Sequence, residues 1–283
     1  MELLKILNIL SFKTKKYRPV SGGDINQTYC LDTDQGKMFL KYNLKSYYPN
    51  LFKCEYKGLK VIEESQTFKI PTIIECNEEN HLQFLILKWI EKGTPQKKTW
   101  EIFGSKLAKM HCIPQPLYGF TEDNYLGTLV QKNPQCISWK DLYSNFRILP
   151  LAEKLFNEKK FNSNDVIATE KFCDFINEIF PSENPSLLHG DLWSGNFIIS
   201  NTQEIYFIDP AVYYGHRKMD IGMSKLFGGF PPLFYESYNE VYPLEKGWIF
   251  RLPYTQLYPL MFHAYEFGGF YIDEVRNILK KFY

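Results

Sequence analysis

The sequence lacks long hydrophobic runs, closely spaced cysteines and a pattern for secretion. It has no run of about 18 apolar residues, the length that a membrane-spanning helix needs. The opening segment MELLKILNIL contains Glu2 and Lys5 and no cleavage pattern follows it, so we expect an amphipathic helix and no secretory signal. The six cysteines form no Cys-x-x-Cys pair, which argues against zinc and against a disulfide framework. We therefore expect a cytoplasmic protein with reduced thiols and no membrane partner.

The sequence also lacks an excess of either charge. Its 33 basic and 32 acidic residues leave a formal net charge of +1. Such a balance gives no indication of a nucleic-acid partner. The sequence also has no run of acidic residues, which would have suggested a polycationic ligand. The 283 residues, 45% of them hydrophobic, are enough for one large domain or for two lobes with their own cores.

Residues up to about 90 have the patterns of short strands and one helix. Apolar residues that alternate on either side of the turn DTDQGK predict a hairpin of residues 28–32 and 37–42. Residues 51–65 have helical spacing, and residues 70–93 are typical of a strand, a turn and a second strand. The second strand, FLILKWI, is continuously apolar, and we expect it to be buried.

Beyond Gly93 helical patterns dominate. Apolar spacing predicts helices over residues 98–113, 138–156, 165–180 and most of 254–283. One strand, 204-EIYFIDPAV-212, interrupts them. We therefore expect an α+β protein, with a small antiparallel sheet lobe over residues 1–90, a hinge at about 87–92, and a larger, mainly helical lobe over residues 91–283.

The segment 187-LLHGDLWSGNFIIS-200 places chemically active side chains on a turn between two apolar runs. His189, Asp191 and Asn196 follow the pattern His-x-Asp-x-x-x-x-Asn. In phosphoryl transfer an aspartate orients the attacking hydroxyl, and an asparagine holds a metal ion against the phosphates. Asp209 ends the apolar strand IYFIDP, where its carboxylate can hold Mg²⁺. The spacing of these residues favours a magnesium-dependent phosphotransferase.

A lysine and a glutamate in the first part of the chain are candidates for holding ATP. Lys41 ends the strand 37-KMFLK-41, and a half-buried lysine is costly unless its ammonium contacts an anion. Glu55, on the predicted helix, is the candidate partner. In kinase-like sites such a pair directs the lysine toward the α- and β-phosphates of the nucleotide.

Two backbone segments are further candidates for contacts with ATP. Paired glycines in the turn 21-SGGD-24 allow backbone N–H groups to approach phosphate, and the candidate contacts there are Gly22, Gly23 and Asp24. The connector 84-FLILKWIEKG-93 joins the two expected lobes, and its extended backbone can form hydrogen bonds with adenine. The candidate contacts there are Leu87, Lys88 and Trp89.

Taken together, these segments resemble the fructosamine kinase family, or ketosamine-3-kinases, within the protein-kinase-like and aminoglycoside-phosphotransferase superfamily. The similar segments run in the family's order from about residue 20 to residue 271, and include GGDINQTY, FLKYN, CEYKGL, LLHGDLWSGN and IYFIDPAVYYGHRKMDIGM. The most specific feature is DLWSGN followed by DPAxYYGxRxxDxxM, because other phosphotransferases share only the HxDxxxxN core.

The resemblance implies a protein-kinase-like two-lobe fold and the use of ATP and Mg²⁺ to phosphorylate the third carbon of a ketosamine. It implies that Asp191 is the catalytic base and that Asn196 and Asp209 bind the metal. In better-known members the phosphorylated sugar then leaves, which repairs a glycated amine. Some relatives carry cysteine where this chain has Asp24, so we expect no thiol-based redox control at that position.

Residues near the catalytic turn have a structural and a functional interpretation. We expect His189 to brace the turn and Asp220 to hold backbone N–H groups of the same turn. Trp193 is expected to contact the sugar or the carrier of the amine. Tyr214 and Arg217 are candidates for the acceptor pocket, and packing is the equal alternative for each.

Two other functions fit part of the sequence. A phosphotransferase acting on an aminoglycoside or on choline would share the core motif. A nucleotide-binding module without catalysis would be expected to lack one of the four residues that are all present here, namely Lys41, Asp191, Asn196 and Asp209. Among ketosamines, the sequence leaves open the choice between fructosamines, ribulosamines and erythrulosamines, because a pocket discriminates weakly by a single carbon. It also leaves open whether a free amino acid or a glycated protein carries the amine.

Overall fold

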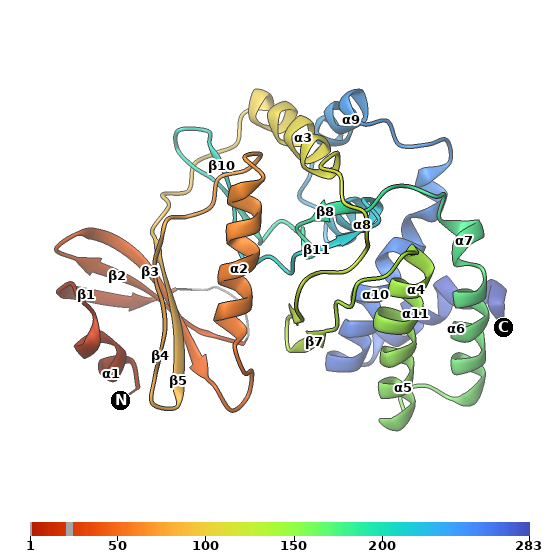
Figure 1. Cartoon of the computed structure of the whole chain (residues 1–283), viewed down its shortest axis with the longest axis horizontal. Coiled ribbons are helices and arrows are strands. Elements are labelled where there is room, and N and C mark those ends of the chain that lie inside the picture. Colours follow the sequence, from red (N-terminus) through yellow and green to blue (C-terminus); the bar gives the residue numbers. More distant parts are fainter. Residues whose placement is uncertain (1, 21–24) are drawn as a thin grey trace.

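An antiparallel sheet with the strand order β1-β2-β3-β5-β4 forms the first lobe of the computed structural model, which describes residues 2–20 and 25–283 (Figure 1). The strands are β1 (Thr14–Pro19), β2 (Gln27–Thr33), β3 (Gly36–Leu44), β4 (Ile73–Glu79) and β5 (Leu82–Lys88). The short helix α1 (Glu2–Ile9) packs on one face of the sheet, and α2 (Leu51–Glu64) packs on the other. The predicted hairpin is confirmed as β2 and β3, and the predicted helix as α2.

Strand β5 is buried on both faces, which explains its continuous apolar sequence. Phe84 and Ile86 pack in a core with residues of α1. Leu85 and Leu87 point the other way and pack in a core with residues of α2. Since neighbouring side chains of a strand alternate between faces, a strand between two layers favours apolar residues on both faces.

The second lobe is mainly helical (Figure 1). Its helices are α3 (Lys97–His111), α4 (Trp139–Tyr143), α5 (Leu149–Asn157), α6 (Ser163–Asp174), α7 (Ile176–Ile179), α8 (Lys218–Leu226), α9 (Pro232–Val241), α10 (Trp248–Phe267) and α11 (Phe270–Leu279). The predicted helix over residues 138–156 is interrupted by a π-helical turn, Ser144–Ile148, and the chain ends in a 3₁₀ turn, Lys280–Phe282. No helix of the described residues is long and apolar enough to cross a membrane.

Three pairs of short strands are set among these helices. They are β6 (Asn124–Leu126) with β7 (Leu129–Gln131), β8 (Ser186–Leu188) with β11 (Tyr213–Gly215), and β9 (Phe197–Ile199) with β10 (Ile205–Phe207). Strand β10 is shorter than the predicted strand over residues 204–212. The reason is that Asp209 has a φ of 51°, a conformation that ends an extended strand.

Aromatic packing joins the two lobes. Phe103 on α3 lies 5.5 Å from Phe68 and 5.1 Å from Phe234 on α9, between ring centroids. The core around Phe103 also contains Leu85 and Leu87 of the sheet, so one apolar cluster continues from the first lobe into the second. The relative positions of the two lobes are therefore fixed by a shared core as well as by the connector.

Candidate active site

The turn between β8 and β9 carries the predicted catalytic residues, and its shape depends on Gly190. That glycine has a φ of +84°, which disfavours other residues. A Cβ atom at Gly190 would lie 2.0 Å from the carbonyl oxygen of Ala211. The turn therefore lies directly against the segment that follows β10, which carries Asp209. A hydrogen bond from the N–H of Ala211 to the carbonyl of His189, of 2.9 Å, joins the two segments.

Two buried side chains hold this turn from behind. Asp220 on α8 accepts hydrogen bonds from the N–H groups of His189 and Gly190, at 2.8 and 3.0 Å. The Nε2 of His189 donates to the carbonyl of Ile208 at 3.0 Å, and its Nδ1 accepts from the N–H of Asp191 at 3.3 Å. Burial lowers the pKa of His189, which keeps the ring neutral and suits both bonds. The expected bracing roles of His189 and Asp220 are confirmed.

Asp191 faces a cavity with its carboxylate held by Asn196. The Nδ2 of Asn196 donates to the Asp191 carboxylate at 2.7 Å and to its backbone carbonyl at 2.9 Å. Burial raises the pKa of Asp191 to about 7, and the nearby charges of Asp209 and Asp220 act in the same direction. This carboxyl can therefore exchange a proton near neutral pH, as a general base requires.

Lys41 is buried between two carboxylates. Its Nζ lies 2.6 Å from the Oε1 of Glu55, which confirms the expected ion pair, and it also contacts the carboxylate of Asp209. Burial disfavours the charged ammonium, but the two carboxylates more than compensate and raise the pKa of Lys41. The Lys41 ammonium thus holds Glu55 of α2 and Asp209 together at the floor of the cavity.

The residues at this floor suit a magnesium ion that is also held by a nucleotide. The amide oxygen of Asn196 and the carboxylate of Asp209 are oxygen donors, and Mg²⁺ prefers to combine a few such ligands with phosphate oxygens and water. No group of three or more His, Cys, Asp or Glu side chains within the described part of the chain forms a complete metal cage. The donor set therefore fits a metal that arrives with phosphates.

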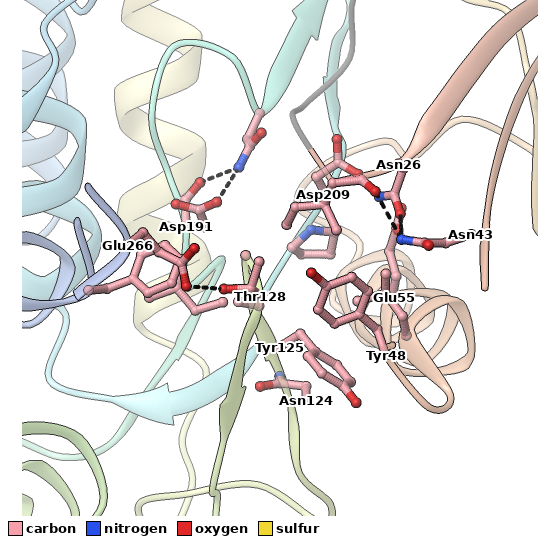
Figure 2. A pocket seen from close by; sticks show the side chains of 18 of the residues that line it. Asn26, Asn43, Tyr48, Glu55, Asn124, Tyr125, Thr128, Asp191, Asp209 and Glu266 are labelled. Carbon is pink, nitrogen blue, oxygen red and sulfur yellow. Dashed lines mark hydrogen bonds between the residues drawn. The ribbon is translucent and has the colours of Figure 1, made fainter. Parts of the chain in front are cut away.

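A cavity of about 1060 Å³ opens between the two lobes (Figure 2). Its floor includes Glu55, Asp191, Asn196 and Asp209. Its walls come from segments far apart in the sequence, and they include Asn26, Asn43, Tyr48, Tyr125, Thr128, Trp193, Phe227, Phe262, His263, Glu266, Phe267 and Tyr271. Among the described residues that line it, none is lysine or arginine. The sequence shows no acidic run, yet folding brings separate carboxylates to one cavity.

The structure brings one of the three predicted acceptor residues to this cavity. Trp193 lines it, with 38% of the side chain exposed. Tyr214 does not, because β11 directs its ring toward Phe120, 6.3 Å away between centroids. Arg217 is buried, and its guanidinium binds the Glu183 carboxylate through two hydrogen bonds of 3.0 Å. Neither Tyr214 nor Arg217 lines this cavity, and these contacts favour the packing alternative for both residues.

The connector offers fewer donors to adenine than expected. The N–H of Lys88 donates to Thr72 at 2.8 Å, and the N–H of Trp89 donates to Lys37 at 3.1 Å. The Leu87 side chain is buried in the core shared by the lobes. These donors serve the sheet, so a contact between adenine and Lys88 or Trp89 cannot use their N–H groups. The predicted contacts at Gly22, Gly23 and Asp24 lie outside the described residues.

Several wall residues carry no motif that sequence reasoning could detect. Thr128 lies in the turn between β6 and β7, and its hydroxyl donates to Glu266 of α10 at 2.6 Å (Figure 2). Tyr125 lies on β6, with its ring 6.3 Å from that of Tyr48. Only the folded chain brings Thr128 and Tyr125 into the same cavity as Asp191.

The fold and the floor of this site define a protein-kinase-like phosphotransferase. The spectinomycin phosphotransferase structure, at 15% identity, has a TM-score of 0.62 over 99% of this chain and 92% of that chain, which shows the shared fold. The crystal structure of the "Putative fructosamine-3-kinase" of Haemophilus somnus 129PT is 26% identical, with a TM-score of 0.87 over 99% of this chain and 95% of that one.

The family model described as fructosamine kinase matches residues 2–283, and the chain belongs to that family. The "Probable ketoamine kinase" of Enterococcus faecium is 38% identical over the whole of both chains. The chloroplastic protein-ribulosamine 3-kinase of Oryza sativa subsp. indica is 32% identical over 92% of this chain and 76% of its own length.

Proposed function

We propose that this kinase transfers the γ-phosphoryl group of ATP to the hydroxyl on the third carbon of a ketosamine. The observation that carries the proposal is the placement of Asp191, Asp209 and the Lys41–Glu55 ion pair at one end of a cavity large enough for a sugar acceptor. Family membership supports the ketosamine as acceptor, because relatives are named ketoamine and ribulosamine kinases.

Asp191 orients the attacking hydroxyl and accepts its proton as the bond to phosphorus forms. Its raised pKa, about 7, makes the carboxylate a stronger base than an exposed aspartate would be. Asn196 fixes the carboxylate by a hydrogen bond of 2.7 Å, and the catalytic turn is in turn fixed by Asp220. Reaction at this site depends on positioning and electrostatics, as in other phosphoryl transfers.

Asn196 and Asp209 would hold the magnesium ion, which neutralises charge on the phosphates when bound. Lys41 would then direct its ammonium to the phosphates while Glu55 keeps the side chain in place. Phosphorylation of the third carbon weakens the link between sugar and amine, so the proposed role is repair of glycated amines.

A panel of acceptors tests the proposal. Purified protein is incubated with ATP, Mg²⁺ and the ribulosamine or fructosamine of Nα-acetyl-lysine, with choline and an aminoglycoside as comparison acceptors. Transfer to a ketosamine that is lost in Asp191→Asn supports the assignment. ATP binding without transfer to either ketosamine contradicts it, and transfer to choline or the aminoglycoside alone identifies the rival phosphotransferase.

A further inference from the structure

The proposed transfer step does not use Glu266, a carboxylate on the wall of the cavity. Glu266 lies near the end of α10, is exposed, and accepts one hydrogen bond from the hydroxyl of Thr128 at 2.6 Å (Figure 2). That donor is neutral, so it brings no opposite charge to the carboxylate. Because no lysine or arginine is among the described residues that line the cavity, the wall around Glu266 is open to a cationic group of a ligand.

Aromatic rings surround His263, one turn away from Glu266 on the same helix. The ring of His263 lies 5.2 Å from Phe227, 5.7 Å from Phe267 and 5.1 Å from Tyr271, between centroids. Phe227 is 43% exposed and Phe267 is 64% exposed, although both line the cavity. Aromatic faces attract cations and gain from being covered, so this wall favours a positively charged, partly apolar ligand group.

The hydrogen bonding of His263 adds an acceptor to the same wall. Its Nδ1 lies 2.7 Å from the carbonyl of Pro259, and a carbonyl can only accept, so Nδ1 is the donor. In the neutral ring Nε2 then carries a lone pair. Carboxylate, imidazole nitrogen and ring faces are all complementary to an N–H-bearing cation.

We propose that Glu266 and the aromatic residues around His263 form a subsite for the protonated amine of the acceptor. The inference rests on the proposed function and extends it: the secondary amine that carries the sugar is protonated at neutral pH, and Glu266 makes the enzyme select acceptors with that charge. The sugar hydroxyls then extend toward Asp191.

Two fructose derivatives that differ in charge test this proposal. These are 1-deoxy-1-methylamino-D-fructose, which is a cation, and 1-deoxy-1-acetamido-D-fructose, which is neutral. Calorimetric titration gives Kd for each with wild type and with Glu266→Gln, and kcat/KM is measured on the same samples. We expect the wild type to prefer the cation, and Glu266→Gln to weaken its binding about tenfold while neutral binding changes less than about twofold.

Two control variants separate the effect of the Glu266 charge from that of its hydrogen bond and from a general loss of surface charge. Thr128→Val removes the hydrogen bond but keeps the carboxylate, and Glu240→Gln neutralises an exposed carboxylate of α9 that does not line the cavity. Both are expected to keep the preference for the cation. Equal binding of the two derivatives by the wild type, or an unchanged preference in Glu266→Gln, overturns the proposal. Absence of phosphoryl transfer to either derivative contradicts the proposed function, while the Kd values still decide the role of Glu266.

Discussion

Individual residues of this site derive their chemistry from their surroundings. An ordinary aspartate has a pKa of 3.8, but burial and two neighbouring carboxylates raise the pKa of Asp191 to about 7. Sequence motifs predicted Asp191, Asn196, Asp209, Lys41 and Glu55 as site residues, because local spacing restricts the chemistry of such residues, and the structure brings these five together. They did not identify Glu266, whose role depends on α10 reaching the β6–β7 turn.

The raised pKa of Asp191 predicts a pH-dependent stability in the absence of nucleotide and metal. The folded state binds the proton more tightly than the unfolded state, so this stabilisation is complete below pH 3.8 and is lost as pH rises through about 7. Relative to Asp191→Asn, the wild type should lose about 3 kcal/mol of unfolding free energy between pH 5 and pH 8. Urea unfolding of both proteins at the two pH values measures this, and an unchanged difference contradicts the assignment.

The buried position of Lys41 predicts a large cost for removing its charge. Lys41→Met leaves the Glu55 and Asp209 carboxylates without their cation and should lower the free energy of unfolding by about 3 kcal/mol. The double variant Lys41→Met/Glu55→Gln should recover part of that loss. As a control, Lys37→Met breaks an exposed ion pair with Glu91 and should leave the urea midpoint unchanged. Equal effects of the two single variants would show that Lys41 is not a buried cation.

Secondary-structure elements position the site, and most of them follow from sequence periodicity. Alternation predicted the hairpin of β2 and β3, and a continuously apolar run predicted β5. Helical spacing predicted α2, α3 and a mostly helical tail, which the structure divides into α10 and α11. The π-helical turn between α4 and α5 could not be predicted, because the apolar spacing continues through it. The direction of Tyr214 also could not be predicted, since the face of a three-residue strand depends on the strand with which it pairs.

The contact between the catalytic turn and the Asp209 segment predicts a site-specific effect of Gly190→Ala. The new Cβ meets the Ala211 carbonyl at 2.0 Å, so the turn has to move away from Asp209. We expect kcat to fall at least about 100-fold, because misplacement by an ångström is costly in positioning catalysis.

Gly36→Ala is the matched control. Gly36 has a φ of +102°, a similar backbone conformation, but a Cβ there meets nothing within 4 Å. It should reduce stability with little change in kcat. Comparable kcat values for the two variants, measured below their melting temperatures, would contradict the proposed arrangement of the turn.

At the scale of the whole molecule, one apolar cluster, the one around Phe103, is shared by the two lobes. The sequence predicted both lobes from the shift in pattern near Gly93, and the fold is confirmed as protein-kinase-like. The acceptor cavity could not be predicted, because its walls come from turns and helices of both lobes. An acidic cavity was not apparent either, since its carboxylates are separated in the sequence.

The shared core predicts that the two lobes unfold together. Phe103 packs against residues of both lobes, so Phe103→Ala should lower stability by about 4 kcal/mol and retain a single transition. Calorimetry of the wild type should show one peak whose calorimetric and van't Hoff enthalpies agree. Two separate peaks in the wild type would show that the lobes are independent units.

Identifying the product decides whether this enzyme phosphorylates the third carbon of a ketosamine. The protein is incubated with ATP, Mg²⁺ and the ribulosamine of Nα-acetyl-lysine, and ³¹P NMR follows the phosphate, with Asp191→Asn in parallel. We expect a new phosphate ester coupled to the proton on the third carbon, formed by the wild type and absent with the variant. An ester on another carbon, or equal product from Asp191→Asn, would contradict it.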